Sequence, residues 1–596
     1  MRSIVFLFTF LLSNNSIFGA DSLEVISVLP TPQAISTEPG EIIQVNFNMR
    51  VDPLSFNDST FMVWGRWSGV HKGIIDFNSI GTTAFFILEK NFFYGEMVTV
   101  SLSKGIKDET GKNMKHGFTW NYWVKVNKGA LDLTKSETIQ VREPGEGWIQ
   151  TYGTYAGDLD ADGWSDFLVP NERPNDVRVF MNDGAGSYSD FSIYRINGGG
   201  RPSPNEGMDF NLDGHIDVAV GNSVNDKLTI FLGDGTGSFS SIQNYVADDG
   251  VRGVAIADVN GNGFMDVITT NRLASNVSIL LNNGDGTFAS PMIFEGNGAG
   301  ETGCATTDVN GDGILDLFIV AHGSDELILF LGTGEGGFSF SAKVIVGKDP
   351  WMVATGDINL DGVPDVVSAN SGASNFSVVL ANEDGSLSNP VNYPTGIFPL
   401  AIDLGDIDGD GDLEVVTSNF VTADFTLYEN DGKGGFINRR NFEADSAGSC
   451  TVLHDRDNDG DMDMTGIDEM DDLLILFTND NFVNVEDEVK SPENFVLHQN
   501  YPNPFNPTTK IKFTIPTQKN PLLGGDYRGG LVTLRVFDIL GTEIAILVKE
   551  VLPDGDYEIE FDARATHPIA LTSGIYFYQL KAGESFIDVK KMILMK

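Results

Sequence analysis

The protein has 596 residues, of which 84 are Asp or Glu and 38 are Lys or Arg, and its formal net charge is −46. The length allows about three to five domains, and a chain that is 41% hydrophobic can build packed cores. So large a negative charge repels phosphate, which argues against nucleic acid as a partner. With only two cysteines in the sequence, a disulfide-dense scaffold is excluded.

The first 20 residues have the features of a secretory signal peptide. Arg2 supplies the positive charge, residues 4–12 form the apolar core, and Gly19 and Ala20 form the small-residue end. This run is too short to span a bilayer, and no other stretch has the length and hydrophobicity of a transmembrane helix. We therefore expect an exported protein without a transmembrane segment.

Residues 22–127 contain short runs of alternating apolar and polar residues separated by turns, which predicts an all-β sandwich. Four motifs occur in the order expected of the bacterial Ig-like domain of the SbsA type, which this segment resembles. They are residues 30–32 (Pro-Thr-Pro), 45–47 (Val-Asn-Phe), 95–100 (Gly-Glu-Met-Val-Thr-Val) and 107–111 (Lys-Asp-Glu-Thr-Gly). The resemblance implies a spacer role, and no ligand site is predicted here.

One pattern, Asp-x-Asp/Asn-x-Asp/Asn-Gly-x-x-Asp/Glu, occurs seven times within residues 129–483. Successive copies begin 51, 49, 50, 49, 49 and 49 residues apart, a regularity that indicates one structural module per copy. The first residues of the copies are Asp158, Asp209, Asp258, Asp308, Asp357, Asp406 and Asp455.

The signals within each repeat come in a constant order. A strand such as residues 254–257 precedes the acidic loop, a short β-rich run follows it, and an alternating strand such as residues 228–232 comes next. A glycine turn, such as residues 233–239, then leads to a fourth, weaker strand. Four short strands per repeat predict a propeller blade, and seven blades predict a closed ring with few exposed edges.

The seventh repeat is cut short after Phe482, so it lacks its outer strand. Residues 137–141, just before the first repeat, have the pattern of such a strand. We therefore predict that this N-terminal segment completes the last blade and closes the ring.

The acidic loops and the Gly-x-Gly-x-Phe turns resemble the FG-GAP/VCBS repeats of the integrin-α type of seven-bladed β-propeller, over residues 129–483. A kelch propeller has a similar period, but its paired-glycine and aromatic signature is absent from this sequence. The resemblance implies Ca²⁺ held between the first two strands of a blade.

The residue types in the loops suit that ion. Calcium takes about six to eight oxygen ligands, and side chains at positions 1, 3, 5 and 9 of the loop can supply carboxylate and amide oxygens. Glycine at position 6 permits the sharp turn, and the backbone carbonyl at position 7 can add a ligand. An EF-hand instead closes with an acid at position 12 and continues as a helix. Mg²⁺ is disfavoured because it keeps its waters.

The seven loops differ in charge, so we expect up to seven Ca²⁺ ions, with the third blade binding most weakly because it offers two carboxylates. The predicted ligands in blade order are Asp158, Asp160, Asp162, Asp166; Asp209, Asn211, Asp213, Asp217; Asp258, Asn260, Asn262, Asp266; Asp308, Asn310, Asp312, Asp316; Asp357, Asn359, Asp361, Asp365; Asp406, Asp408, Asp410, Glu414; and Asp455, Asp457, Asp459, Asp463. The alternative is that the loops are Asp/Asn/Gly turns without metal, because these residues favour turns in any case.

A polar linker, residues 484–493, precedes a last β domain at 494–596, with strands predicted at 510–515, 532–538, 556–562, 574–580 and 590–595. The domain resembles the C-terminal sorting domain of the type IX secretion system, apart from a glycine-rich insertion at 518–531. The matching motifs are residues 501–507 (Tyr-Pro-Asn-Pro-Phe-Asn-Pro), 536–541 (Val-Phe-Asp-Ile-Leu-Gly), 573–576 (Ser-Gly-Ile-Tyr) and 590–592 (Lys-Lys-Met). The resemblance implies recognition by the type IX secretion machinery and a place outside the cell or on its surface.

No catalytic motif stands out in the sequence. It contains neither a His-Glu-x-x-His metal motif nor a Gly-x-Ser-x-Gly nucleophile elbow. We interpret His215 and His454 as bystanders, and Cys304 and Cys450 as buried apolar residues on inner strands of blades four and seven. The predicted function is binding or adhesion by a calcium-stabilised propeller, with a glycan or a surface protein on the propeller face. The alternative is a polysaccharide-active lyase or glycosidase.

Overall fold

The computed structural model describes residues 22–479, 496–515, 531–538, 543–551, 555–564, 571–582 and 586–595. The predicted signal peptide and the predicted linker lie outside the described residues, as does nearly all of the predicted insertion. The chain forms two units, Met1–Phe482 and Val483–Lys596. Among the described residues the regular structure is β-strand apart from one short 3₁₀ helix, η1 (Pro53–Ser55), which confirms the all-β prediction.

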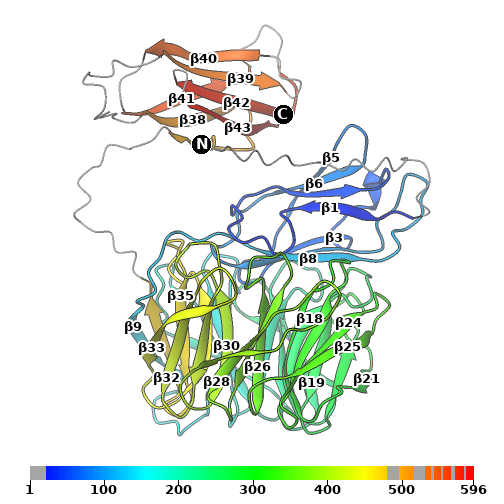
Figure 1. Ribbon diagram of the computed structural model, residues 1–596, viewed down its shortest axis with the longest axis vertical. Helices are drawn as coiled ribbons and strands as arrows, with labels where there is room; N and C mark the ends of the chain where they lie inside the picture. The colour runs from blue at the N-terminus through cyan, green and yellow to red at the C-terminus, as the bar shows by residue number, and fades with distance from the viewer. Residues whose placement is uncertain are drawn as a thin grey trace, which may run out of the picture. The chain divides into compact units, whose positions relative to one another are not determined.

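The first domain is a sandwich of two four-stranded sheets (Figure 1). Their strand orders are β1 (Val25–Leu29), β2 (Ile43–Phe47), β6 (Thr83–Leu88), β5 (Gly73–Phe77), and β4 (Gly69–Val70), β3 (Phe61–Gly65), β7 (Met97–Leu102), β8 (Phe118–Trp123). The apolar residues that alternate in the sequence line the core of the sandwich. In β7 these are Val98, Val100 and Leu102, and all three are fully buried.

Seven further four-stranded sheets follow in chain order and form the blades of the predicted propeller. Blades one to four are β10 (Tyr155–Gly157), β11 (Asp166–Asn171), β12 (Asp176–Phe180), β13 (Phe191–Arg195); β14 (Pro202–Met208), β15 (Asp217–Asn222), β16 (Lys227–Gly233), β17 (Phe239–Val246); β18 (Val251–Ala257), β19 (Asp266–Asn271), β20 (Asn276–Leu280), β21 (Met292–Glu295); and β22 (Glu301–Thr307), β23 (Asp316–Ala321), β24 (Glu326–Gly332), β25 (Phe338–Ile345). Blades five to seven are β26 (Pro350–Gly356), β27 (Asp365–Asn370), β28 (Asn375–Val379), β29 (Val391–Pro394); β30 (Pro399–Gly405), β31 (Glu414–Asn419), β32 (Asp424–Asn430), β33 (Phe436–Glu443); and β34 (Gly448–His454), β35 (Asp463–Asp468), β36 (Leu473–Thr478), β9 (Thr134–Gln140).

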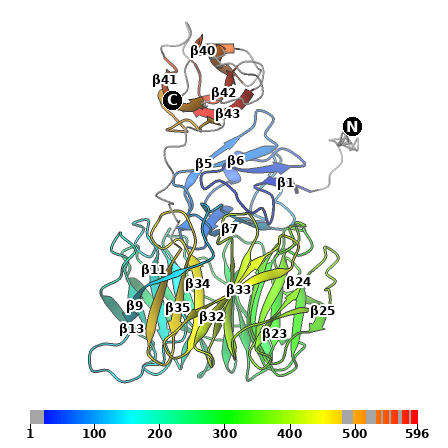
Figure 2. The ribbon, with the colours of Figure 1, turned by 60° about the vertical axis from the view of Figure 1, so that its left-hand side comes forward.

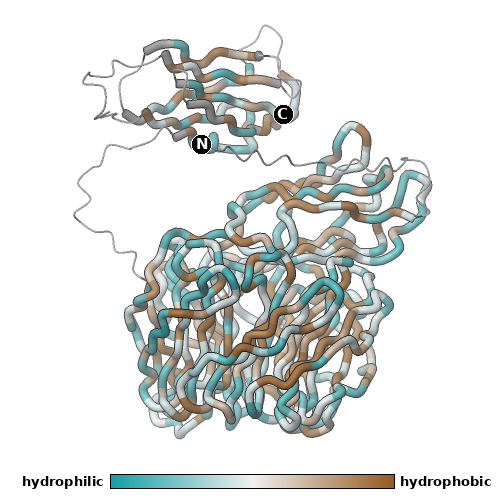
Figure 3. The backbone as a smooth tube through the Cα atoms, viewed as in Figure 1, coloured by the Kyte–Doolittle hydropathy of each residue, from teal (hydrophilic) through white to brown (hydrophobic). Residues whose placement is uncertain are grey.

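The burial of the residues in each strand depends on the position of that strand in the blade. Second strands are covered on both faces by neighbouring blades, so all six residues of β15 are buried, whereas none of the eight residues of the outer strand β17 is. In Figure 3 the long hydrophobic stretches accordingly follow the propeller strands. First strands crowd together around the axis and need small residues: a Cβ on Gly303 would lie 2.7 Å from the Cα of Met352 in the next blade.

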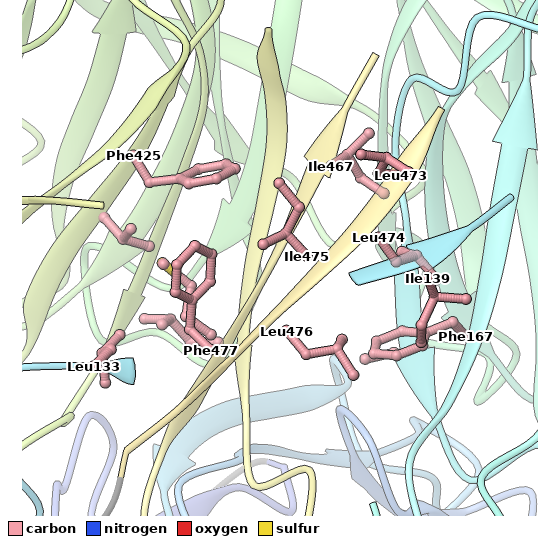
Figure 4. Packing of buried hydrophobic residues seen from close by; sticks show 14 of the residues in the cluster. Leu133, Ile139, Phe167, Phe425, Ile467, Leu473, Leu474, Ile475, Leu476 and Phe477 are labelled. Carbon is pink, nitrogen blue, oxygen red and sulfur yellow. The ribbon is translucent and has the colours of Figure 1, made fainter. Parts of the chain in front are cut away.

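The N-terminal strand closes the ring as predicted. β9 pairs antiparallel with β36, with Ile139 opposite Leu474 and Thr138 opposite Ile475. Ile139 is 8% exposed and belongs to a cluster that also contains Phe167 of the first blade (Figure 4). One strand thus joins the last blade to the first by hydrogen bonds on one side and apolar packing on the other.

The C-terminal unit contains a three-stranded and a four-stranded sheet around one apolar core. Their strand orders are β37 (Val496–Leu497), β38 (Thr508–Ile515), β41 (Gly555–Asp562), and β40 (Glu543–Val551), β39 (Leu531–Asp538), β42 (Gly574–Ala582), β43 (Phe586–Leu594). All five predicted strands are present. β40 was not predicted, because its pairing with β39 shifts register between the Leu534–Val548 and Arg535–Ile546 pairs and this bulge interrupts its alternation.

We expect Ile139→Ala to lower the free energy of unfolding of the propeller unit by about 2 to 4 kcal/mol, because it removes a buried side chain from the ring closure. Denaturant unfolding measures the change, and Glu137→Ala, at an exposed position of the same strand, is the control. Equal stability of the two variants would contradict closure by β9.

Candidate metal sites and the covered face of the propeller

The seven acidic loops all join the first strand of a blade to the second, so they lie at one end of the ring. The second loop shows the shared geometry. The N–H of Gly214 donates to Asp209 Oδ2 at 2.8 Å, and Gly214 has a φ of 90°, which favours glycine. Asp217 accepts N–H groups from Phe210 (2.8 Å) and from Gly233 at the end of the third strand (2.7 Å). The carboxylates at positions 1 and 9 therefore fold the loop around themselves.

Three loops bring carboxylates together closely enough for one cation. In each of the first, sixth and seventh blades, at least three carboxylates offer oxygens that all lie within 4.8 Å of one another. The groups are Asp158, Asp160, Asp166; Asp406, Asp408, Glu414; Asp410, Asp412, Glu414; and Asp455, Asp457, Asp459. Within them the buried oxygens Asp158 Oδ1, Asp408 Oδ1 and Asp455 Oδ1 have no hydrogen-bond partner. These are the blades with four predicted carboxylates.

In the second and fifth blades the position 3 asparagine is bonded to the position 5 acid. Asn211 Nδ2 donates to Asp213 Oδ2 and Asn359 Nδ2 to Asp361 Oδ2, each at 2.9 Å. In the fourth blade Asn310 Oδ1 accepts the N–H of Asp312 at 2.9 Å. The predicted ligands Asp308, Asp316, Asp357 and Asp365 occupy positions 1 and 9 of their loops.

The third blade is the weakest in charge, as its sequence shows, and it also receives a lysine from the first domain. The Nζ of Lys104 donates to the carbonyl of Asn260 at 2.7 Å, and the N–H of Lys104 donates to Gly261. Asn262 turns the loop by accepting the N–H of Phe264, while Asp258 accepts the N–H of Gly263 at 2.7 Å. Asp266 is fully buried.

When they are ionised, the buried carboxylates within a loop repel one another. Burial, together with the charges of other carboxylates in the same loops, raises the pKa of Asp166, Asp217 and Asp455 to about 8 and that of Asp158 to about 7. A divalent cation among these oxygens would offset the repulsion.

Two further acids of these loops were not identified from the sequence. Asp412 and Asp461 occupy position 7, for which the pattern specified only a backbone carbonyl. Asp412 joins Asp410 and Glu414 in a carboxylate group, and Asp461 is fully buried. Burial, followed by the charge of Asp459, raises the pKa of Asp461 to about 9. The Asp-Gly-Asp sequences at 410–412 and 459–461 are the signal from which these two acids could have been identified.

The first domain covers the end of the ring that carries the loops (Figures 1 and 2). Backbone hydrogen bonds join it, or the segment that follows it, to five of the seven loops. They are Asp158 N–H to Trp67 O (2.8 Å), Lys104 N–H to Gly261 O (2.8 Å), Thr119 N–H to Gly313 O (2.7 Å), Gly129 N–H to Asp408 O (3.2 Å) and Asn127 N–H to Gly460 O (2.6 Å). The domain is thus a cap on the propeller.

Arg66, in the turn between β3 and β4, reaches the first strands around the axis of the ring. Its Nη1 lies 3.1 Å from Asp403 Oδ1 of β30, and its carbonyl accepts the hydroxyl of Tyr155 at 3.0 Å. The fully buried Glu96 holds this turn by accepting the N–H groups of Trp67 (2.9 Å) and Ser68 (3.0 Å). Sequence reasoning did not identify Arg66, Glu96 or Asp403, because no local pattern links residues so far apart.

A cavity of about 280 Å³ lies along the axis beneath the cap. First strands from all seven blades line it, and Arg66 and Trp123 of the cap reach it from one end. Cys304 and Cys450 line the cavity as free thiols, as their placement on inner strands predicted. His454 is fully buried and its pKa is lowered to about 3 by burial, so it is neutral and suits the bystander interpretation.

Comparison with known proteins agrees with this architecture. FG-GAP-like repeats match residues 209–269, 258–319, 308–368 and 357–417, a bacterial Ig-like domain matches 20–124, and a secretion system C-terminal sorting domain matches 499–595. The chain is a modular FG-GAP-repeat propeller protein. Its sorting domain directs it through the type IX secretion system to the cell surface or the medium. No helix in the described part of the chain is long and apolar enough to cross a membrane, and no curated protein matches the chain.

Solved structures resemble the FG-GAP-repeat protein only distantly. A lectin of Agrocybe aegerita that recognises non-reducing terminal N-acetylglucosamine is 17% identical, with a TM-score of 0.38, over 71% of this chain and 94% of the lectin. A functionally unknown protein of Desulfotomaculum acetoxidans is 12% identical (TM-score 0.36; 58% and 96% covered). A Polycomb Repressive Complex 2 chain of Chaetomium thermophilum is 8% identical (TM-score 0.41; 58% and 97% covered). At these TM-scores none of them bears on the function.

We expect Arg66→Met to destabilise the protein by about 2 to 3 kcal/mol, because Asp403, whose side chain is 8% exposed, would lose its cation. Denaturant unfolding measures the loss, and Arg439→Met on the exposed outer strand β33 is the control. If the two variants unfold alike, the Arg66–Asp403 pair does not hold the cap.

The metal-stripped protein should melt at a lower temperature near pH 8 than near pH 5. Asp166 and Asp217 have folded pKa values of about 8 against ordinary values of 3.8, so between these values the folded state binds more protons than the unfolded state. Stability therefore falls as pH rises through this window. Calorimetric scans across about pH 5 to 8 test this, and a melting temperature that rises with pH in the absence of metal would contradict it.

Proposed function

We propose that this exported propeller binds calcium in its acidic loops and binds a ligand at the cell surface or in the medium without catalysing a reaction. The observation that carries the calcium assignment is the set of buried carboxylate groups with unpaired oxygens at one end of the ring. Oxygen-only donors and shared negative charge suit a hard divalent cation. Repeats of this kind commonly hold calcium, and the sorting domain supports a role outside the cell.

The proposed ligands are the residues at positions 1, 3, 5 and 9 of each loop, with Asp412 and Asp461 added in the sixth and seventh. Calcium would neutralise the buried charge and tie the first strand of a blade to the second. We expect the first, sixth and seventh loops to bind most tightly, because they gather the most carboxylates. The third loop should bind most weakly, because it has two carboxylates and already holds the Lys104 ammonium group.

The domains that the chain contains support a binding role. The chain matches repeats, an Ig-like domain and a sorting domain. The acidic residues of the repeated pattern lie in the propeller loops and do not form an isolated pair that could act as catalytic acid and base. Selective retention on an array of glycans and surface proteins, with no loss of substrate in polysaccharide digests, is the expected result. Turnover of a polysaccharide would support the lyase or glycosidase alternative instead.

Calcium should raise the melting temperature of the metal-stripped protein, and Asp160→Ala should reduce the number of ions bound. Asp160 belongs to the carboxylate group of the first loop and is only half-buried, so its loss should leave the metal-free fold nearly unchanged. Calorimetric titration with Ca²⁺ measures the stoichiometry, and the exposed Asp190→Ala is the control. No heat and no change in melting temperature with Ca²⁺ would overturn the calcium assignment.

A further inference from the structure

The end of the ring opposite the cap is the face that remains free for a ligand. It is formed by the starts of the first strands and by the turns between second and third strands, because the acidic loops and the cap occupy the other end. Five of the ten arginines within residues 129–483 belong to this end, in a chain whose net charge is −46. They are Arg142, Arg173, Arg201, Arg252 and Arg272.

Two of these arginines meet two aromatic rings. The guanidinium of Arg252 lies 5.5 Å from the ring centre of Tyr152 and 5.6 Å from that of Trp351, and Arg272 lies 5.0 Å from Trp351. Trp351 Nε1 donates to the Tyr152 hydroxyl at 3.0 Å, although the two residues belong to different blades. Glu172 lies beside Arg252 at 3.5 Å. We call these five residues the arginine–aromatic cluster.

The two arginines of the cluster differ in their partners. Arg252 has Glu172 and the Ser203 hydroxyl, which accepts from its Nη1 at 3.1 Å. Arg272, by contrast, forms no ion pair with a carboxylate among the described residues, and its guanidinium lies over the Trp351 ring. The nearby Asp349 is paired with His322 at 3.4 Å and Lys348 at 3.5 Å. Burial and the charge of Arg252 lower the pKa of Arg272, and these effects outweigh the opposite effect of Asp349.

We propose that the arginine–aromatic cluster binds an acidic saccharide, with Arg272 pairing with the carboxylate of a uronic acid residue. This rests on the proposed binding function and specifies the ligand class. A guanidinium presents paired N–H donors that match a carboxylate, and a half-buried one gains more from the pairing than an exposed one. Arg272 has no carboxylate partner among the described residues, so it is the arginine of the cluster that can pair with an anionic ligand.

The surroundings favour a saccharide over a peptide or a polyanion. Hydroxyl groups of a sugar find both donors and acceptors here, since Glu469 accepts from Gln150 Nε2 at 3.1 Å and the Tyr152 hydroxyl lies beside Trp351. Exposed apolar residues of this face lie outside the cluster: Val224 and Leu273 belong to blades two and three, and Ile397, Phe398 and Val421 lie together in blade six. The net charge repels densely charged polymers more strongly than a short saccharide with one carboxylate on each sugar among its hydroxyls.

The test uses tri-galacturonate and its fully methyl-esterified form as matched probes, titrated calorimetrically into the calcium-loaded protein. We expect the acid to bind at least about tenfold more tightly than the ester, and Arg272→Gln to reduce the affinity for the acid by about tenfold or more. Arg439→Gln, on an exposed outer strand, should have no effect. Higher salt should weaken binding of the acid and leave the ester unchanged.

Equal binding of acid and ester, no binding of either, or equal affinity of both variants would overturn the proposal. So would Arg272-dependent binding of a capped tri-aspartate peptide without binding of the saccharide. The calcium-induced rise in melting temperature, recorded on the same samples, separates the two levels of the argument. If it persists while tri-galacturonate fails to bind, the saccharide assignment falls and the proposed calcium-stabilised propeller stands.

Discussion

Negative charge buried at one end of the ring is the constraint on which the rest of the propeller unit depends. Each loop needs its position 1 and position 9 carboxylates to bind the backbone N–H groups that would otherwise be unpaired in a sharp turn. The same two carboxylates therefore lie close together away from water, and their pKa values rise. A fold that repeats this device seven times accumulates electrostatic repulsion, which protonation of the carboxylates or a bound cation would relieve.

The cap supplies some positive charge to the ring. It brings Lys104 to the third loop and Arg66 to Asp403, and its backbone N–H groups bond to carbonyls of further loops. These contacts also bury the loops more deeply, which strengthens every interaction inside them and makes an uncompensated carboxylate costlier. If the loops bind calcium as proposed, the ion and the cap stabilise the same loops, so loss of the ion would also weaken the contacts of the loops with the cap. The Ig-like domain is thus part of the propeller and more than a spacer.

The sequence was informative wherever the structure is local and periodic. The seven acidic patterns placed the turns, the alternation placed the strands, and the truncated last repeat pointed to β9 as its missing strand. The side chains that hold the cap to the ring could not be found in this way, because Arg66 and Asp403 are more than three hundred residues apart in the chain and neither belongs to the acidic pattern. Asp412 and Asp461 were missed for the opposite reason: they lie inside the pattern, at a position whose side chain the pattern leaves unspecified.

The two ends of the ring use their cations differently. At the capped end carboxylates are fixed by the folding of the loops, and Arg66 and Lys104 bind groups of the propeller there. At the free end arginines also pair with buried acids, as Arg252 does with Glu172 and Arg142 with Asp472, but Arg272 has no carboxylate partner among the described residues and is only half-buried. Arg272 is therefore available to serve a ligand, which suits the role proposed for it. Under that proposal the acidity of the chain as a whole sharpens selectivity, since the ligand must carry enough negative charge to pair with Arg272 but too little to be repelled by the rest of the molecule.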